Sequence, residues 1–167
     1  MYEFMLELHI AGIIICLYML YLLLRRKGRQ SNSFVVLAIV LNIFILTGYT
    51  FELLSTNVQE MLLAIQIGYM GKCFAGICFV TGIGKYYNWK YRPETLPVLW
   101  GIGFLSFFVI MTAKYHNMYY TSVGMIWRDG HAFCSLGKAP YYYFFFSYLI
   151  FMFLYFSWRC LSHRKFV

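Results

Sequence analysis

Long apolar stretches alternate with short polar ones along the whole chain, and this alternation predicts its elements. Each apolar stretch is close to the roughly 20 helical residues that cross the hydrocarbon core of a bilayer. The pattern predicts spanning helices over residues 5–24, 34–54, 61–84, 96–113 and 140–158. The fold class that follows is an all-α polytopic membrane helix bundle, with residues 1–167 forming a single transmembrane domain.

Local signals mark several ends of these helices. A basic run from Arg25 to Arg29 closes the first stretch. Asn57 with Glu60 three residues later resembles a capping box, which predicts the start of the third helix. Pro140 suits the first turn of the fifth helix, where its missing N–H costs nothing.

The segment between the fourth and fifth stretches, residues 114–139, has a strand pattern of its own. Strand-forming residues run from Tyr119 to Trp127, and a second run covers residues 132–136. Asp129-Gly130 between them is typical of a tight type I′ turn. We therefore predict an extracytoplasmic β-hairpin, with an ordinary interfacial loop as the alternative.

Composition supports the membrane assignment and excludes other classes. Of the 167 residues, 62% are hydrophobic and 12% charged, with a mean hydropathy of +0.65. Soluble domains carry about 25% charged residues. The chain therefore lacks the polar coat of a soluble enzyme, a disordered tail or a disulfide-rich secreted module.

The basic residues predict topology rather than nucleic-acid binding. The formal net charge is +8, and ten of the fourteen basic residues lie in segments 25–33, 85–95 and 159–167. These segments fall on one side of the five predicted spans. By the positive-inside rule that side is cytoplasmic, so we expect a multi-pass membrane protein. Its N-terminus is then outside and its C-terminus inside, and the bilayer is its first partner.

No catalytic constellation is visible in the sequence. The four histidines show no i, i+4 pair, and the five cysteines form no CxxC or zinc-site spacing. The stretch from Gly82 to Lys85 resembles the end of a phosphate-binding loop, but Phe79 occupies the position where that motif needs its first glycine. We predict no catalytic residue, no metal site and no cofactor.

Charged residues inside the apolar stretches are the candidate functional residues. Glu7 and Glu52 lie near the predicted outer surface, whereas Lys72 lies near the membrane midplane. A lysine at that depth costs about 2.5–3.5 kcal/mol unless it finds partners. Its helix face also carries the small residues Gly68, Ala75 and Gly76, so we expect this face to pack inside the bundle. We therefore predict a polar signal pocket of Lys72, Glu52, Tyr49 and Tyr69, linked through the tyrosine hydroxyls or ordered water.

Several short motifs resemble one family of bacterial membrane sensors. The motifs are GYTFELLST (48–56), EMLLA (60–64), GYMG (68–71), YHN (115–117) and GKAPYY (137–142). Together they resemble the N-terminal seven-helix sensor region of bacterial histidine kinases, which also precedes diguanylate cyclase domains.

The resemblance implies a sensory input module of signal transduction rather than an enzyme. Its implied partners are a cytoplasmic kinase or diguanylate cyclase output domain, absent from this chain, and a second copy of the module. The chain holds five of the seven helices, which suggests a truncated form or a separate output partner. The alternative function is a small membrane transporter component or an assembly factor, although no repeat or broken helix favours transport.

Overall fold

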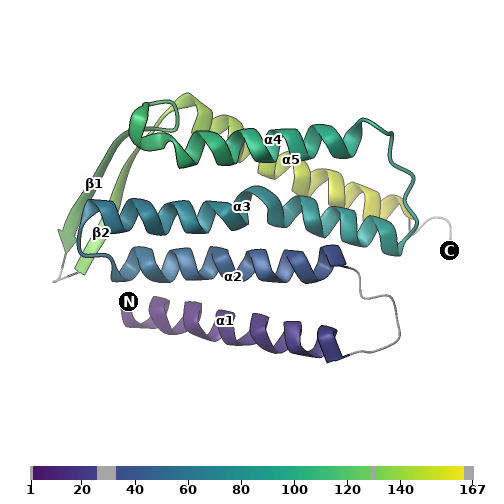
Figure 1. The fold of residues 1–167 in the computed structure, drawn as a ribbon, viewed down its shortest axis with the longest axis horizontal. Helices are drawn as coiled ribbons and strands as arrows, with labels where there is room; N and C mark the ends of the chain where they lie inside the picture. Colours follow the sequence, from purple (N-terminus) through teal and green to yellow (C-terminus); the bar gives the residue numbers. More distant parts are fainter. Residues whose placement is uncertain (1, 26–32, 129–130, 164–167) are drawn as a thin grey trace.

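The computed structural model describes residues 2–25, 33–128 and 131–163 as five helices and a two-stranded sheet (Figure 1). The helices are α1 (Tyr2–Arg25), α2 (Ser33–Leu54), α3 (Val58–Tyr86), α4 (Thr95–Met111) and α5 (Pro140–His163), with the short 3₁₀ helix η1 (Ala113–Tyr115). The strands are β1 (Tyr120–Arg128) and β2 (His131–Lys138). These bounds lie close to the stretches that the hydrophobic pattern predicts.

The helices lie roughly along one common direction, and the hairpin closes one end of the bundle. Helices α1, α2 and α3 lie side by side in chain order, and α4 and α5 continue the bundle beyond α3 (Figure 1). The start of α1 and the hairpin lie at the same end. The end of α5 lies at the opposite end, so the two ends of the molecule carry different elements.

Four of the five helices are long and apolar enough to cross a membrane, namely α1, α2, α3 and α5. Helix α4 has 17 residues, which give a length of about 25 Å. Its predicted end at residue 113 is wrong, because the helix ends at Met111 and the chain continues into η1. The prediction of five full-length spans is therefore supported for four helices only.

Small residues let α2 and α3 approach each other closely. A Cβ atom added to Gly48 would lie 2.5 Å from the Cα of Gly68, and one added to Gly71 would collide with the carbonyl of Leu41. Ala38 and Ala75 are buried in the same contact, together with Leu41 and Cys78. Small residues permit such backbone contact in membranes, where no hydrophobic effect drives helices together.

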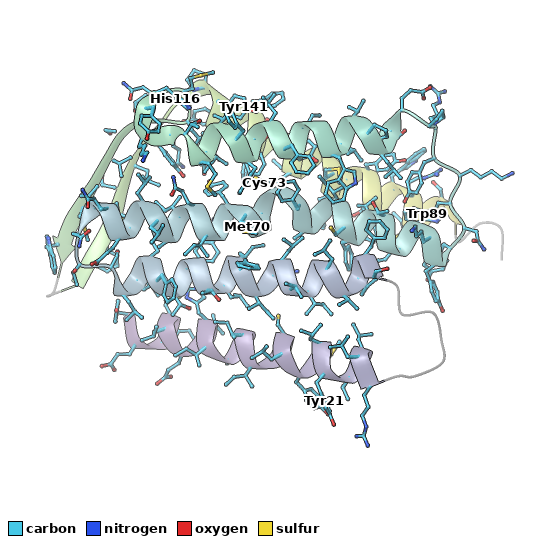
Figure 2. All side chains as sticks on the ribbon, in the orientation of Figure 1. Tyr21, Met70, Cys73, Trp89, His116 and Tyr141 are labelled. Atoms are coloured by element: carbon cyan, nitrogen blue, oxygen red, sulfur yellow. The ribbon has the colours of Figure 1, made fainter. Side chains whose placement is uncertain are left out.

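The larger core lies among α3, α4, α5 and the hairpin. Its buried side chains come from one face of α3, from α4 and from α5, and Tyr119 and Tyr120 join them from the start of β1. Cys73 lies between α3 and α4, and Tyr21 on α1 points away from the bundle (Figure 2). Helix α1 has no buried residue and packs on α2.

The hairpin and the helix cap agree with the sequence. Strands β1 and β2 pair antiparallel from Tyr120↔Lys138 to Arg128↔His131, and the expected turn residues Asp129 and Gly130 lie outside the described residues. At the start of α3, the Asn57 side chain accepts a hydrogen bond from the Glu60 N–H at 2.9 Å. The Glu60 carboxylate in turn accepts one from the Thr56 N–H, also at 2.9 Å. The predicted start of the helix and the Asn57 cap are therefore confirmed, whereas the Glu60 carboxylate accepts from the residue before the N-cap.

Candidate functional site

Lys72 lies between two aromatic rings inside the bundle. Its Nζ atom is 4.2 Å from the ring centroid of Tyr49 on α2 and 4.4 Å from that of Tyr69 on α3. Gly68, one turn earlier on α3, carries no side chain that would fill this space. The ammonium group therefore meets the electron-rich faces of two tyrosines, which is the geometry of a cation–π interaction.

Glu52 brings the opposite charge to the same region. It is half-buried near the end of α2, and its carboxylate interacts electrostatically with Lys72 and, more weakly, with His9 of α1. We refer to Lys72, Tyr49, Tyr69 and Glu52 as the Lys72 cluster. The structure thus brings together the four residues that the sequence analysis selected, with ring faces as the contacts of Lys72.

The hairpin covers the Lys72 cluster. Cys134 of β2 lies against the Glu52 carboxylate, and burial together with this carboxylate raises the pKa of its thiol to about 12. Tyr119 packs edge-on against Tyr69 with ring centroids 5.4 Å apart, and it packs against Tyr120 at 4.8 Å. Burial, with the nearby Tyr69 phenol, raises the pKa of Tyr119 and Tyr120, so both phenols stay neutral.

Helix α1 completes the surroundings of the cluster. The His9 ring stacks on the outer side of Tyr49 with centroids 5.6 Å apart and an angle of 14° between the planes. Tyr2 also donates a hydrogen bond to the Leu53 carbonyl at 3.0 Å, which ties α1 to the end of α2. Residues from α1, α2, α3 and the hairpin therefore meet at one place.

Two expectations about neighbouring residues have different outcomes. Glu7 is exposed on α1, and its place near the outer membrane surface stays a prediction. Gly76 was expected on the small-residue face that packs inside the bundle together with Gly68 and Ala75. That expectation is wrong for Gly76, because a Cβ atom there would meet no other atom within 4 Å.

Four neighbours of the cluster were not predicted from the sequence, namely His9, Cys134, Tyr119 and Tyr120. His9 is the only histidine inside a predicted span, and this position could have marked it. The rotation of α1 about its axis, which decides what His9 meets, has no signal in the sequence.

The site offers side chains that can bind a charged or polar group. Within the described ranges 2–25, 33–128 and 131–163, no group of three or more His, Cys, Asp or Glu residues could hold a metal ion. The cluster offers one cation, one carboxylate and several phenol rings in a low-dielectric setting. Such a set can hold a charged or polar group, and its geometry depends on how α2, α3 and the hairpin pack.

A comparison with protein families decides the class of the chain. A family model described as the N-terminal 7TM region of histidine kinase matches residues 8–163. The chain belongs to this family. Comparisons with curated proteins and with solved structures gave no match.

Membership of the histidine kinase 7TM family confirms the resemblance that the sequence motifs carry. It makes the chain an integral membrane protein, in agreement with its four long apolar helices. The family is a membrane-embedded sensory input region of histidine kinases, so the site just described lies in a sensory domain. The match includes α1 from Leu8 onward, the hairpin and α5, and therefore every element around the Lys72 cluster.

Proposed function

We propose that the chain is the transmembrane input module of a bacterial signalling protein, and that the Lys72 cluster is its signal pocket. The module relays a stimulus to a cytoplasmic histidine kinase domain, and a second copy of the module is a further expected partner. It performs no catalysis itself. The observation that carries the proposal is the ammonium group of Lys72 held between rings from two different helices.

The position of Lys72 makes the helix packing sensitive to its contacts. Tyr49 belongs to α2 and Tyr69 to α3, so a small shift between these helices separates Lys72 from one of its rings. Glu52 links the same site to the hairpin through Cys134. A stimulus that binds one arrangement better than the other shifts the population between the two.

The same arrangement supports one orientation in the membrane. The N-terminus and the hairpin lie at one end of the bundle and the end of α5 at the other (Figure 1). With the basic segments 25–33, 85–95 and 159–167 in the cytoplasm, the Lys72 cluster lies beneath an extracytoplasmic hairpin. A stimulus can then arrive from outside or within the inner membrane, and the output leaves from α5.

Replacing Lys72 with methionine tests the proposal. Methionine avoids the cost of placing a charge at membrane depth, and this gain balances the two ring contacts that are lost, so we expect Lys72→Met to unfold in detergent near the wild-type temperature. In the histidine kinase that carries this region, the variant should lock kinase output at one level under conditions that change the wild-type output. Glu52→Gln should weaken the response less, because the amide keeps part of the hydrogen bonding.

A matched control is available on the same helix. Lys85, near the other end of α3, lies 4.4 Å from the ring centroid of Phe34 and makes the same kind of contact outside the cluster. Lys85→Met should respond as the wild type does. A wild-type response by Lys72→Met would show that this lysine has no signalling role.

A further inference from the structure

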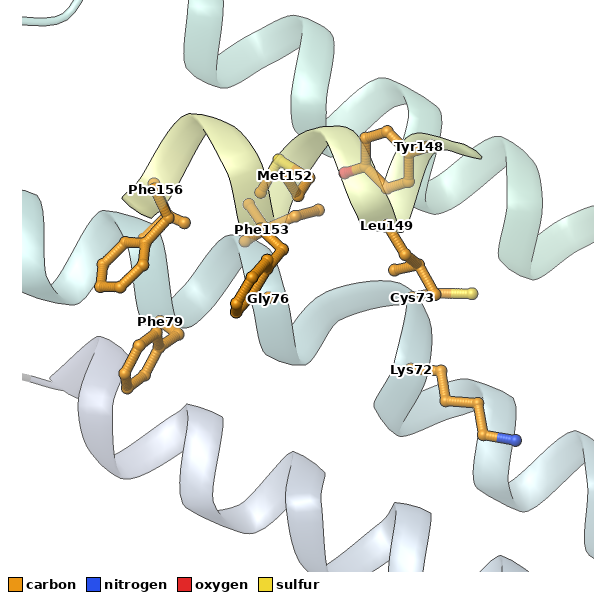
Figure 3. A pocket seen from close by; sticks show the side chains of 11 residues that line it. Lys72, Cys73, Gly76, Phe79, Tyr148, Leu149, Met152, Phe153 and Phe156 are labelled. Atoms are coloured by element: carbon orange, nitrogen blue, oxygen red, sulfur yellow. The ribbon is translucent and has the colours of Figure 1, made fainter. Parts of the chain in front are cut away.

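A cavity lies between α3 and α5. Its volume is about 200 Å³, and its walls are almost entirely apolar (Figure 3). Residues from both helices line it, among them Gly76, Phe79, Leu149, Met152, Phe153 and Phe156. Lys72 also lines the cavity, but its ammonium group points away from Phe79 and Phe156 (Figure 3), so the cavity meets the Lys72 cluster only at this residue.

The cavity opens sideways from the bundle where α3 has no side chain. Gly76 is exposed, and a Cβ atom at this position would meet nothing within 4 Å. Phe153, on the rim, is 69% exposed. Because α3 and α5 are long enough to cross a membrane, this opening faces hydrocarbon.

The polar groups around the cavity already have partners. The Tyr148 hydroxyl donates a hydrogen bond to the Leu99 carbonyl at 3.2 Å, and Lys72 is held by Tyr49 and Tyr69. An occupant therefore meets walls that are almost entirely apolar, and the Tyr148 O–H among them already donates to a backbone carbonyl. Apolar walls without such groups favour a hydrocarbon chain.

A chain of aromatic contacts runs from the cavity to a basic residue at the end of the bundle. Phe156 packs against Phe79 at 5.3 Å and against Trp89 at 6.1 Å between ring centroids. The Arg159 guanidinium lies 5.5 Å from the Trp89 ring. Arg159 follows Phe156 by three residues, which is about 4.5 Å along α5.

Arg159 keeps hydrogen-bonding capacity at that place. One Nη donates to the Lys90 carbonyl at 2.9 Å, and within the described part of the chain its buried Nε has no partner. Lys85 and Lys90 are exposed at the same end of the molecule. A basic site at the membrane surface, next to a groove between helices, is suited to an anionic lipid headgroup.

We propose that the α3–α5 cavity binds one acyl chain of an anionic phospholipid whose headgroup is held by Arg159. The headgroup lies at the membrane surface and the chain runs inward past Phe156 to Gly76. A free fatty acid offers the same acyl chain with a carboxylate for Arg159, and the experiment below distinguishes the two sources. This inference goes beyond the sensory role and stands without it.

Photolabelling of the protein in lipid vesicles tests the site. The protein is reconstituted in phosphatidylcholine vesicles that contain a small fraction of phosphatidylglycerol with a diazirine at mid-chain. Labelled peptides are then quantified by mass spectrometry. We expect residues 72–80 and 148–156 to be labelled several-fold more than the lipid-facing residues of α1. Phosphatidylcholine with the same diazirine chain should label them less.

Variants that fill the cavity or remove the charge of Arg159 make the test specific. Gly76→Leu should lower labelling of these two segments several-fold, whereas Gly101→Leu should not, since Gly101 of α4 also faces open space. Arg159→Gln should lower labelling by phosphatidylglycerol to the phosphatidylcholine level. Lys114→Gln is the matched charge control, because Lys114 is exposed and lies 4.6 Å from the Tyr115 ring centroid.

The outcomes distinguish the possible sources of the acyl chain. Should Gly76→Leu aggregate, Leu149→Phe fills the cavity from the α5 side and serves in its place. Unchanged labelling in a folded, filled variant overturns the cavity assignment. Equal labelling by the two phospholipids overturns the headgroup assignment, and stronger labelling by a diazirine fatty acid shows that the source is a free fatty acid.

Discussion

Lys72 shows how a single charge is accommodated at membrane depth. A lysine near the centre of a helix costs about 2.5–3.5 kcal/mol on insertion scales. A cation–π contact returns about 2 kcal/mol when it is shielded from water, and Lys72 makes two such contacts. The two rings together therefore return a free energy of the same size as the cost, without an ion pair. The charge persists inside the bundle only as long as α2 and α3 hold both rings in place.

Cys134 reports on the charge of Glu52. Its pKa of about 12 leaves about one thiol in ten thousand as thiolate at pH 8, so alkylation by a maleimide should be very slow. Glu52→Gln removes the neighbouring negative charge, which should lower the pKa of the thiol and raise the alkylation rate several-fold. Peptide mass spectrometry identifies the modified cysteine. Equal alkylation rates in both proteins would show that the charge of Glu52 does not act on the Cys134 thiol.

At the scale of the element, the contact between α2 and α3 depends on glycine. Gly48→Leu would place a side chain against the backbone of Gly68 and should push the helices apart. Overpacking typically costs 1–3 kcal/mol, and contact with a backbone places this variant at about 3 kcal/mol or more. Denaturant titration in detergent measures the loss. Gly101→Leu, which meets no atom within 4 Å, should be as stable as the wild type or up to about 1 kcal/mol more stable.

The cap of α3 is a second element-scale test. Asn57→Ala removes the acceptor for the Glu60 N–H and should lower the free energy of unfolding by about 1 kcal/mol. Gln59 is exposed in the same turn, and Gln59→Ala should change stability by less than about 0.5 kcal/mol. A similar loss in both variants would mean that general helix propensity, and not the cap, accounts for the effect.

The elements follow from the sequence more readily than their contacts do. Long apolar stretches and the strand pattern around Asp129-Gly130 predict the helices and the hairpin, because each signal is local. The early end of α4 at Met111 escaped prediction because Thr112 and Ala113 are compatible with a helix. Lys72 and Glu52 stand out as charges in apolar surroundings, but Cys134 meets Glu52 only through the pairing and tilt of the hairpin.

At the scale of the whole molecule, the two ends of the bundle should face different compartments. Reporter fusions after Val167 should be active only in the cytoplasm, and insertions at Asp129-Gly130 should be accessible from outside. The physical reason is the gathering of basic residues at segments 25–33, 85–95 and 159–167. Periplasmic activity of the Val167 fusion would reverse the orientation and place the Lys72 cluster at the inner surface.

The shortness of α4 has a consequence for the surrounding lipid. About 25 Å of helix beside a hydrocarbon layer of about 30 Å creates hydrophobic mismatch, which the bilayer relieves by thinning locally. The long neighbour α3, with 29 residues, tolerates a thick bilayer by tilting instead. Stretching or thickening of the membrane therefore acts on α3 and α4 unequally. We therefore expect a change of bilayer thickness to alter how the helix that carries Lys72 packs against α4.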